Sequence, residues 1–384
     1  MKTNKTISVV ISAILCSGIL FTGCGGGSDV KSNTPESVIQ DTSENSDGDL
    51  NNITENPSIE EIGSFTINNY SEIEKGVVDY NNAKVFISDQ VNLYIYDISN
   101  ISEPKFSNIY GLYGGGHNIV LSEDNKLFID NLTSLKILDV TNPKAINEIG
   151  EYKDNGFIEY FVLSSDRKTA FAIINNSLSI IDINDTANPE LVKKIELSDV
   201  NKLQISNDDK KLYAMFKGTK KGLAILDLTD KENPVLKDEY LINDNTIVVN
   251  DVAISKDNSI ALLSTSKGLI ILDISNPDDI QEITTYSSNH TFNSAIIASN
   301  KKRVFALDKQ NLKVAILDIV DPENPEEINS IDFLETYSTP HNIFLSNDET
   351  KLFVATTVSG EGSNPITGLT KIYIFDVSSY TNTK

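Results

Sequence analysis

The sequence predicts an all-β fold, a seven-bladed β-propeller of four-stranded blades, and three observations support this prediction. An apolar run that ends in an aspartate recurs along the chain, the repeating unit is about 45 residues long, and no stretch carries a sustained helical period. Four short strands per unit at this spacing are typical of propeller blades. The repeated aspartates number the blades from 1 to 7 as Asp97, Asp139, Asp182, Asp227, Asp273, Asp318 and Asp376.

Each unit divides into four strands separated by turn residues. In the unit of Asp227 the strands are VNKLQIS from Val200, KLYAMF from Lys211, GLAILDL from Gly222 and PVLKDEYL from Pro234. The third strand is apolar throughout because a middle strand of a blade has a neighbouring blade on each side. The aspartate that ends it is expected to accept a hydrogen bond from the backbone N–H two residues later, and the following proline to start the fourth strand.

The ends of the chain predict how the ring closes. The seventh unit stops soon after IYIFDVS, which begins at Ile372, and therefore lacks a fourth strand. The segment IEEIGSFTI, which begins at Ile59, matches the fourth strand PEEINSIDF of another unit. We therefore expect this N-terminal strand to complete the last blade and to leave no open sheet edge.

The first residues have the pattern of a bacterial lipoprotein signal. Lys2 and Lys5 precede an apolar run from Ile7 to Phe21, which is too short to span a bilayer. The run is followed by Thr-Gly-Cys, which resembles a lipobox whose cysteine, Cys24, receives the lipid. This resemblance implies a cell-envelope protein that is anchored to a membrane by lipid and exposed outside the cytoplasm.

Three regions follow from these patterns. Residues 1–23 form the expected signal peptide and residues 59–384 the propeller. Residues 24–58 are rich in Gly, Ser, Asn and acid, and we expect them to form a disordered acidic tether. After cleavage Cys24 carries lipid and Cys16 is lost, so no disulfide or cysteine metal site is expected.

The net charge of −23 argues against nucleic acid as a partner, because phosphate binding needs a basic surface. The same charge opposes electrostatic attraction to anionic lipid, so the membrane contact is assigned to the lipid alone.

The repeated strands that end in aspartate, followed in most units by Asn-Pro, resemble the LVIVD-repeat family of bacterial and archaeal cell-surface proteins. The resemblance covers residues 59–380 and includes LKILDVTNP from Leu135 and LIILDISNP from Leu269. It implies a surface location and a propeller fold, and no defined activity. His-Asn stands in units 2 and 7 where the family often has His-Asp at the start of the first strand, which weakens a carried-over role for that acid.

Polar residues are expected at the mouth of the central channel, where the first strand of each blade begins. Aligning these strands gives one register that is polar in every unit: Lys75, His117, Glu159, Asn201, Asn250, Asn293 and His341. Asn118, Tyr160, Asp251 and Asn342 lie next to it. The predicted ligand-binding residues are Lys75, His117, Asn118, Glu159, Tyr160, Asp251, His341 and Asn342.

Two alternatives stay open for this register. His117 and His341 are weak candidates for a metal site, since histidine is a common metal ligand. The other interpretation is a hydrated ring of polar side chains that lines a channel, and no cofactor is expected. On the same side of the propeller, an insertion that begins at Val358 is a candidate partner-binding loop or a tolerated insertion.

The expected function is a binding or scaffolding module for a protein or glycan of the cell envelope. Nucleophile, zinc-protease and nucleotide-binding motifs are absent from usable contexts in the sequence. The alternative is a polysaccharide-active lyase or hydrolase at the channel mouth, with Glu159 and Asp251 as its possible carboxylate pair.

Overall fold

The computed structural model describes residues 58–68, 72–79, 81–112, 114–287, 290–334, 338–358 and 369–381. The expected signal peptide and Cys24 lie outside these residues, as does the tether apart from Ser58. The chain divides into two compact units, and the second, Glu55–Lys384, contains every described strand. Among the described residues, no helix is both long enough and apolar enough to cross a membrane.

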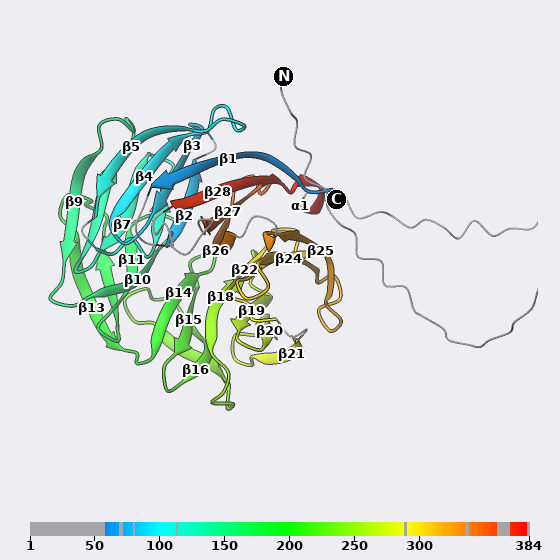
Figure 1. Ribbon diagram of the computed structural model, residues 1–384. Helices are drawn as coiled ribbons and strands as arrows, with labels where there is room; N and C mark the ends of the chain where they lie inside the picture. Colours follow the sequence, from blue (N-terminus) through cyan, green and yellow to red (C-terminus); the bar gives the residue numbers. More distant parts are fainter. Residues whose placement is uncertain are drawn as a thin grey trace, which may run out of the picture. The chain divides into compact units, whose positions relative to one another are not determined.

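The second unit is a ring of seven antiparallel four-stranded sheets (Figure 1). Blade 1 contains β2 (Lys75–Asp79), β3 (Lys84–Ser88), β4 (Asn92–Asp97) and β5 (Lys105–Gly111). Blade 2 contains β6 (Ile119–Leu121), β7 (Lys126–Asn131), β8 (Ser134–Asp139) and β9 (Asn147–Lys153). Blade 3 contains β10 (Ile158–Leu163), β11 (Thr169–Ile174), β12 (Ser177–Asp182) and β13 (Glu190–Glu196). Blade 4 contains β14 (Val200–Ile205), β15 (Lys211–Lys217), β16 (Lys221–Asp227) and β17 (Val235–Leu241).

The remaining blades repeat this order, and one short helix follows them. Blade 5 contains β18 (Val249–Ile254), β19 (Ile260–Thr265), β20 (Gly268–Asp273) and β21 (Gln281–Tyr286). Blade 6 contains β22 (Ser294–Ile297), β23 (Arg303–Asp308), β24 (Lys313–Asp318) and β25 (Glu326–Asp332). Blade 7 contains β26 (Ser338–Leu345), β27 (Lys351–Val358), β28 (Leu369–Asp376) and β1 (Glu60–Asn68). Helix α1 spans Ser378–Thr381.

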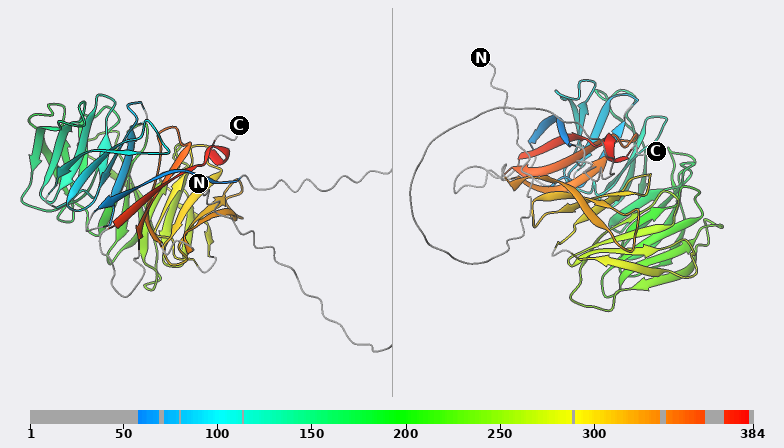
Figure 2. Two further views of the ribbon diagram at one scale, coloured as in Figure 1. Left: turned by 45° about the horizontal axis from the view of Figure 1, so that its top comes forward. Right: turned by 90° about the vertical axis from the view of Figure 1, so that its right-hand side faces the viewer.

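The predicted ring closure is confirmed. Strand β1 runs antiparallel to β28, with Phe65 opposite Ile372 and Thr66 opposite Lys371. Figures 1 and 2 show the first described strand, in blue, beside the last strand, in red. The side chains of Phe65 and Ile67 are buried in an apolar cluster that joins blade 7 to blade 1. The last blade is thus built from both ends of the described chain.

Seven apolar clusters, one between each pair of neighbouring blades, hold the ring together. The middle strands supply most of their side chains and are buried along almost their whole length, as β11 and β15 illustrate. The outer strands are largely exposed, as in β13. The continuous apolar runs therefore have the cause that the sequence predicted, namely burial on both faces of a middle strand.

The predicted role of the repeated aspartates is also confirmed. In all seven blades the aspartate that ends the third strand accepts a hydrogen bond from the backbone N–H two residues later. The expected start of the fourth strand at the proline holds less generally. In blades 2 and 5 the strand begins four residues after Pro143 and Pro277, because a further turn intervenes.

Candidate functional site

One cavity of about 370 Å³ is lined by the innermost strands of all seven blades. We call it the mouth cavity because its polar residues lie at or near the starts of these strands, where the sequence predicted a binding site. Each blade contributes a polar side chain to its wall: Lys75 with Glu74, His117, Tyr160, Lys202, Asp251, Ser294 and Asn342 in blades 1 to 7. Its volume lies at the lower end of the range for small-molecule sites.

The predicted register is displaced by one residue in four blades, because each first strand contains a bulge. The pairing skips Glu159, Asn201, Asn250 and His341, the residues that the sequence placed in the register. A bulge inserts one unpaired residue and re-aims the side chains that follow it. The next residue lines the cavity instead, which is Tyr160, Lys202, Asp251 and Asn342 in these blades.

Lys202 is the main site residue that sequence reasoning missed. Its ammonium forms an ion pair with the carboxylate of Asp251, and its Nζ lies 5.7 Å from the centre of the Tyr160 ring. Burial pulls the pKa of Lys202 down, but the Asp251 carboxylate outweighs this effect and holds the pKa above its ordinary value. The charges of this pair therefore compensate each other inside the cavity wall.

Lys75 lines the same cavity without such a partner. In the described part of the chain, its ammonium has no hydrogen bond or ion pair, although its side chain is partly buried. Burial lowers its pKa to about 8, and the positive charge of Lys202 acts in the same direction. The neighbouring Glu74 already accepts a hydrogen bond of 2.9 Å from the side chain of Gln90.

His117 is held by a buried carboxylate. Its Nδ1 lies 2.8 Å from Oδ2 of Asp130, which is fully buried and also accepts a hydrogen bond from the backbone N–H of Asn118. The hydrogen bond to Asp130 raises the pKa of His117. Because Nδ1 is engaged, Nε2 is the ring nitrogen that remains for contacts in the cavity.

His341 lies in the joint between blades 7 and 1. Its Nε2 accepts a hydrogen bond of 3.1 Å from the backbone N–H of Ile73, and its Nδ1 lies 3.2 Å from the hydroxyl of Thr357. Burial lowers the pKa of His341, which agrees with an unprotonated Nε2. Both ring nitrogens are engaged, so a metal could bind only by displacing one of these contacts.

The structure does not bring the two metal candidates into a ligand set. No cluster of three or more His, Cys, Asp or Glu side chains suited to a metal occurs within the described ranges. The third histidine, His290, belongs to blade 6, where its Nδ1 lies 2.5 Å from Asp308. Asp130 and Asp308 both lie near the end of the second strand of their blades, and His290 does not line the mouth cavity.

Several predicted ligand-binding amides join neighbouring blades. The side-chain amide of Asn118 donates to the carbonyl of Phe161 in blade 3 at 2.7 Å. The amide of Asn342 donates to the carbonyl of Glu74 in blade 1 at 2.7 Å. These hydrogen bonds give both residues a structural role. Of the carboxylates considered as a catalytic pair, Asp251 is paired with Lys202, and Glu159 occupies a bulge and does not line the cavity.

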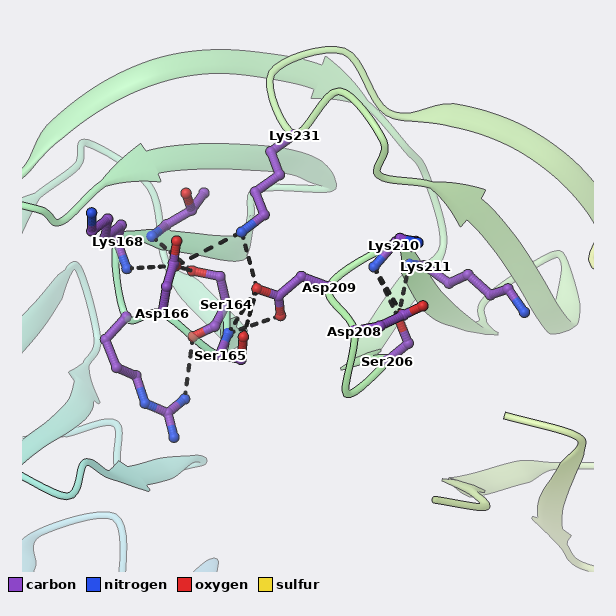
Figure 3. A network of polar contacts seen from close by, with 12 residues as sticks. Ser164, Ser165, Asp166, Lys168, Ser206, Asp208, Asp209, Lys210, Lys211 and Lys231 are labelled. Carbon is purple, nitrogen blue, oxygen red and sulfur yellow. Dashed lines mark hydrogen bonds and ion pairs between the residues drawn. The ribbon is translucent and has the colours of Figure 1, made fainter. Parts of the chain in front are cut away.

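At the other end of the innermost strands, the turns repeat one arrangement in five blades. A serine hydroxyl donates to the aspartate two residues later and accepts a backbone N–H that starts the second strand. The serines are Ser122, Ser164, Ser206, Ser255 and Ser346. Figure 3 shows two of these turns, which Asp209 connects. The carboxylate of Asp209 accepts hydrogen bonds from Ser165 and forms an ion pair with Lys231. These turns form hairpin contacts within a blade and, through Asp209, a contact between blades.

The insertion that begins at Val358 lies mostly outside the described residues. Strand β27 ends at Val358 and β28 begins at Leu369, so residues 359–368 fall between them. Its expected role in partner binding stays a prediction.

Comparison with known proteins addresses the repeat and the fold. The LVIVD repeat matches residues 85–111, 171–196 and 261–288, which lie in blades 1, 3 and 5. The chain carries LVIVD repeats and folds as a seven-bladed β-propeller. Each matched segment begins in the second strand of its blade and reaches the fourth, so it contains the buried third strand and its terminal aspartate.

Solved structures resemble this LVIVD-repeat propeller at low identity. The Cps50 (Swd1) β-propeller domain of Myceliophteria thermophila aligns with a TM-score of 0.63 and 10% identity, over 83% of this chain and 100% of that domain. Hydrazine synthase from Kuenenia stuttgartiensis aligns with a TM-score of 0.60 and 14% identity, over 75% of this chain and 93% of that one. At such identities the likeness concerns the fold alone. No curated protein matches the chain at a significant level.

Proposed function

We propose that this propeller is a lipid-anchored binding module outside the cytoplasm, whose partner is a protein or a glycan of the cell envelope. The observation that carries the proposal is the mouth cavity. Each blade contributes to it, yet the contributed side chains differ in charge and shape from blade to blade. The turns at the other end of the same strands repeat one arrangement. A wall that departs from the repeat is suited to recognising an asymmetric ligand.

The expected partner group enters the mouth cavity and meets charged and hydrogen-bonding side chains at once. Lys75 and His117 supply donors, and Tyr160 supplies a ring face and a hydroxyl. A small number of placed polar groups over a partly apolar wall is typical of ligand sites. The wall includes apolar side chains such as Ile343 and Phe344.

Screening the protein against envelope glycans and envelope extracts tests this function. Wild-type protein is expected to retain a ligand that the double variant Lys202→Met with Asp251→Leu does not retain. This pair is removed together because a lone buried charge would be strongly destabilising. The control is Ser206→Ala, at the other end of β14, which should retain the ligand. Equal retention by the mouth variant and the wild type would count against the proposal.

The lipid anchor is supported by the sequence around Cys24 and has its own test. In cells fed a clickable fatty acid, the wild-type protein is expected to be labelled and to sediment with membranes. Cys24→Ala should abolish the label, whereas Cys16→Ala should retain it, because Cys16 leaves with the signal peptide. Labelling of the Cys24 variant would exclude this anchor.

A second candidate function, a polysaccharide lyase or hydrolase, is favoured by the His117–Asp130 contact. A histidine whose Nδ1 is held by a buried carboxylate presents Nε2 as a potential general base. Incubation with acidic polysaccharides separates the two chemistries, since a lyase generates an ultraviolet-absorbing unsaturated product and a hydrolase generates only new reducing ends. Activity that His117→Gln abolishes would favour the enzyme over the binding module.

A further inference from the structure

We propose that the mouth cavity binds a carboxylate group and that the ammonium of Lys75 is its principal partner. The proposal rests on the proposed binding function and names the ligand class of the same site. The ligand that fits is a sugar acid, either free or as a uronate residue of an envelope glycan.

The charges in the cavity wall single out Lys75. Lys202 is paired with Asp251, and His117 with the buried Asp130. Glu74 accepts a hydrogen bond from Gln90 and forms no ion pair with Lys75 among the described contacts. Within the described residues, Lys75 is thus the cavity-lining cation without a compensating partner, and an anion is the group that would supply one.

The location of Lys75 makes its charge unusually available to a ligand. An exposed lysine is strongly hydrated, whereas Lys75 is partly withdrawn from water and lies near a second cation, Lys202. A hydrogen bond between an ammonium and a carboxylate is stronger in such a site than in water. The residue after Lys75 is Gly76, and a Cβ there would lie 2.3 Å from the Phe344 ring. Gly76 lines the cavity without a side chain, so the side chains that blade 1 contributes to the wall are those of Lys75 and Glu74.

A monoanion fits better than a phosphate or a polyanion. The ammonium of Lys75 has no ion-pair partner among the described residues of the wall, and a single carboxylate would supply one. A phosphate dianion would leave an excess negative charge beside Asp251 and Glu74. The net charge of −23 on the chain adds a general repulsion that grows with ligand charge. Hydroxyl groups on Tyr160 and Ser294 and the ring nitrogen of His117 suit the hydroxyls of a sugar.

Binding should be linked to protonation of Lys75. The titratable groups that line the cavity with it are Glu74 of its own blade and His117, Tyr160, Lys202 and Asp251 of other blades. With a pKa of about 8, Lys75 is mostly protonated at pH 7 and mostly neutral at pH 9. A bound carboxylate favours the ammonium, so affinity should fall as the pH rises above about 8, with proton uptake on binding.

The test is calorimetry of the full-length purified protein with glucuronate, a glucuronate oligosaccharide, glucose and inorganic phosphate. We expect glucuronate to bind, glucose to bind at least about tenfold more weakly, and phosphate not to compete. Lys75→Met should weaken glucuronate binding by roughly ten- to a hundredfold, as expected for loss of a charge-assisted hydrogen bond. Lys75→Arg should retain binding within a few fold and lose the decline above pH 8, because arginine stays protonated.

A second variant separates Lys75 from His117, whose pKa is raised by its hydrogen bond to Asp130. His117→Gln should keep the decline in affinity above pH 8, and loss of that decline would assign the proton to His117 and overturn the role of Lys75. If the oligosaccharide binds and the monosaccharide does not, the ligand is a glycan; equal binding identifies a free sugar acid.

The outcomes also separate this inference from the proposed function. If glucuronate does not bind, or binds equally to Lys75→Met, the carboxylate assignment fails, while a ligand retained through the Lys202–Asp251 wall would still support the binding module. If mouth variants retain every partner found in the screen, the proposed function fails as well.

Discussion

The two ends of the innermost strands differ in how closely they follow the repeat. At the end that holds the Ser-x-Asp turns, five blades use the same hydroxyl, the same carboxylate and the same backbone N–H. All seven turns also place a non-glycine residue at positive φ, as Asn125 and Arg167 do in blades 2 and 3. At the mouth cavity the corresponding positions hold lysine, histidine, tyrosine, aspartate, serine and asparagine. Positions that form the turns stay alike among the blades, and positions that line the mouth cavity diverge.

This comparison holds only while the ring is closed, and a substitution in β1 should have the largest effect. Ile67 is 1% exposed, in the cluster between blades 7 and 1. Ile67→Asp leaves an uncompensated buried charge, which costs roughly 3 to 5 kcal/mol. We expect a lower midpoint of thermal unfolding, by circular dichroism, together with loss of ligand binding at the mouth.

Thr66→Asp is the matched control, because Thr66 is exposed on the opposite face of the same strand. It should change the unfolding midpoint little. Equal destabilisation by the two variants would show that the charge itself, and not its burial at the closure, is responsible.

Loss of a repeated turn should destabilise the fold without affecting the mouth. Ser206 is 1% exposed, and its hydroxyl bonds Asp208 and the backbone N–H groups of Lys210 and Lys211. Ser206→Ala leaves these groups partly unsatisfied and should cost about 2 kcal/mol of unfolding free energy in a denaturant titration. Ser164→Ala, the equivalent change in blade 3, should cost a similar amount. A change in ligand affinity in either variant would contradict the claim that the turns contribute to folding and not to binding.

The inter-blade amides offer a smaller test at the mouth itself. Asn118 is 4% exposed and donates to Phe161 in the next blade, whereas Asn201 is exposed at a bulge. Asn118→Ala should cost about 1 kcal/mol, and Asn201→Ala less than half as much. Denaturant unfolding of both variants measures the difference. The reverse order would show that Asn201, at the bulge of β14, stabilises the propeller more than the inter-blade hydrogen bond of Asn118 does.

The last expected effect has the opposite sign. The folded-state pKa of Lys75, about 8, lies below its ordinary value of 10.5, so the buried charge destabilises the fold fully below pH 8. This penalty fades as the pH rises toward 10.5. Lys75→Met should therefore raise the unfolding midpoint at pH 7, and the gain should shrink at higher pH. Lys105→Met, in the exposed strand β5, should show neither effect. Absence of a gain at pH 7 would mean that Lys75 is already compensated.

A residue whose removal stabilises the fold while weakening binding is retained for function. If Lys75→Met raises the unfolding midpoint and lowers the affinity for the ligand, the mouth differs from the turns, where removal of a side chain lowers stability.

Most of the fold could be predicted from the sequence because its causes are local and repeated. The aspartates Asp97 to Asp376 mark the blade period, and the match between the segment at Ile59 and other fourth strands reveals the closure. Both follow from burial and turn chemistry within a single unit.

The mouth was predicted less completely because a bulge is not visible in residue type. Lys75, His117, Tyr160, Asp251 and Asn342 were placed near the channel, and the cavity contains them. Lys202 was missed because the register was aligned on Asn201, the residue that the bulge leaves unpaired. The sequence held a signal for Lys202. The equivalent positions of the neighbouring units hold Tyr160 and Asp251, so a search for positions whose residue type varies between units would have identified Lys202.

The pairing of β1 with β28 also sets an order of events during synthesis. The first strand of the propeller to leave the ribosome is joined to a partner that is made roughly 300 residues later. Until then the nascent chain holds six blades that can form one after another and a seventh that cannot. Throughout this interval Phe65 and Ile67 lack the blade 7 side chains of their apolar cluster, so we expect the first strand to be the segment most in need of protection by a chaperone.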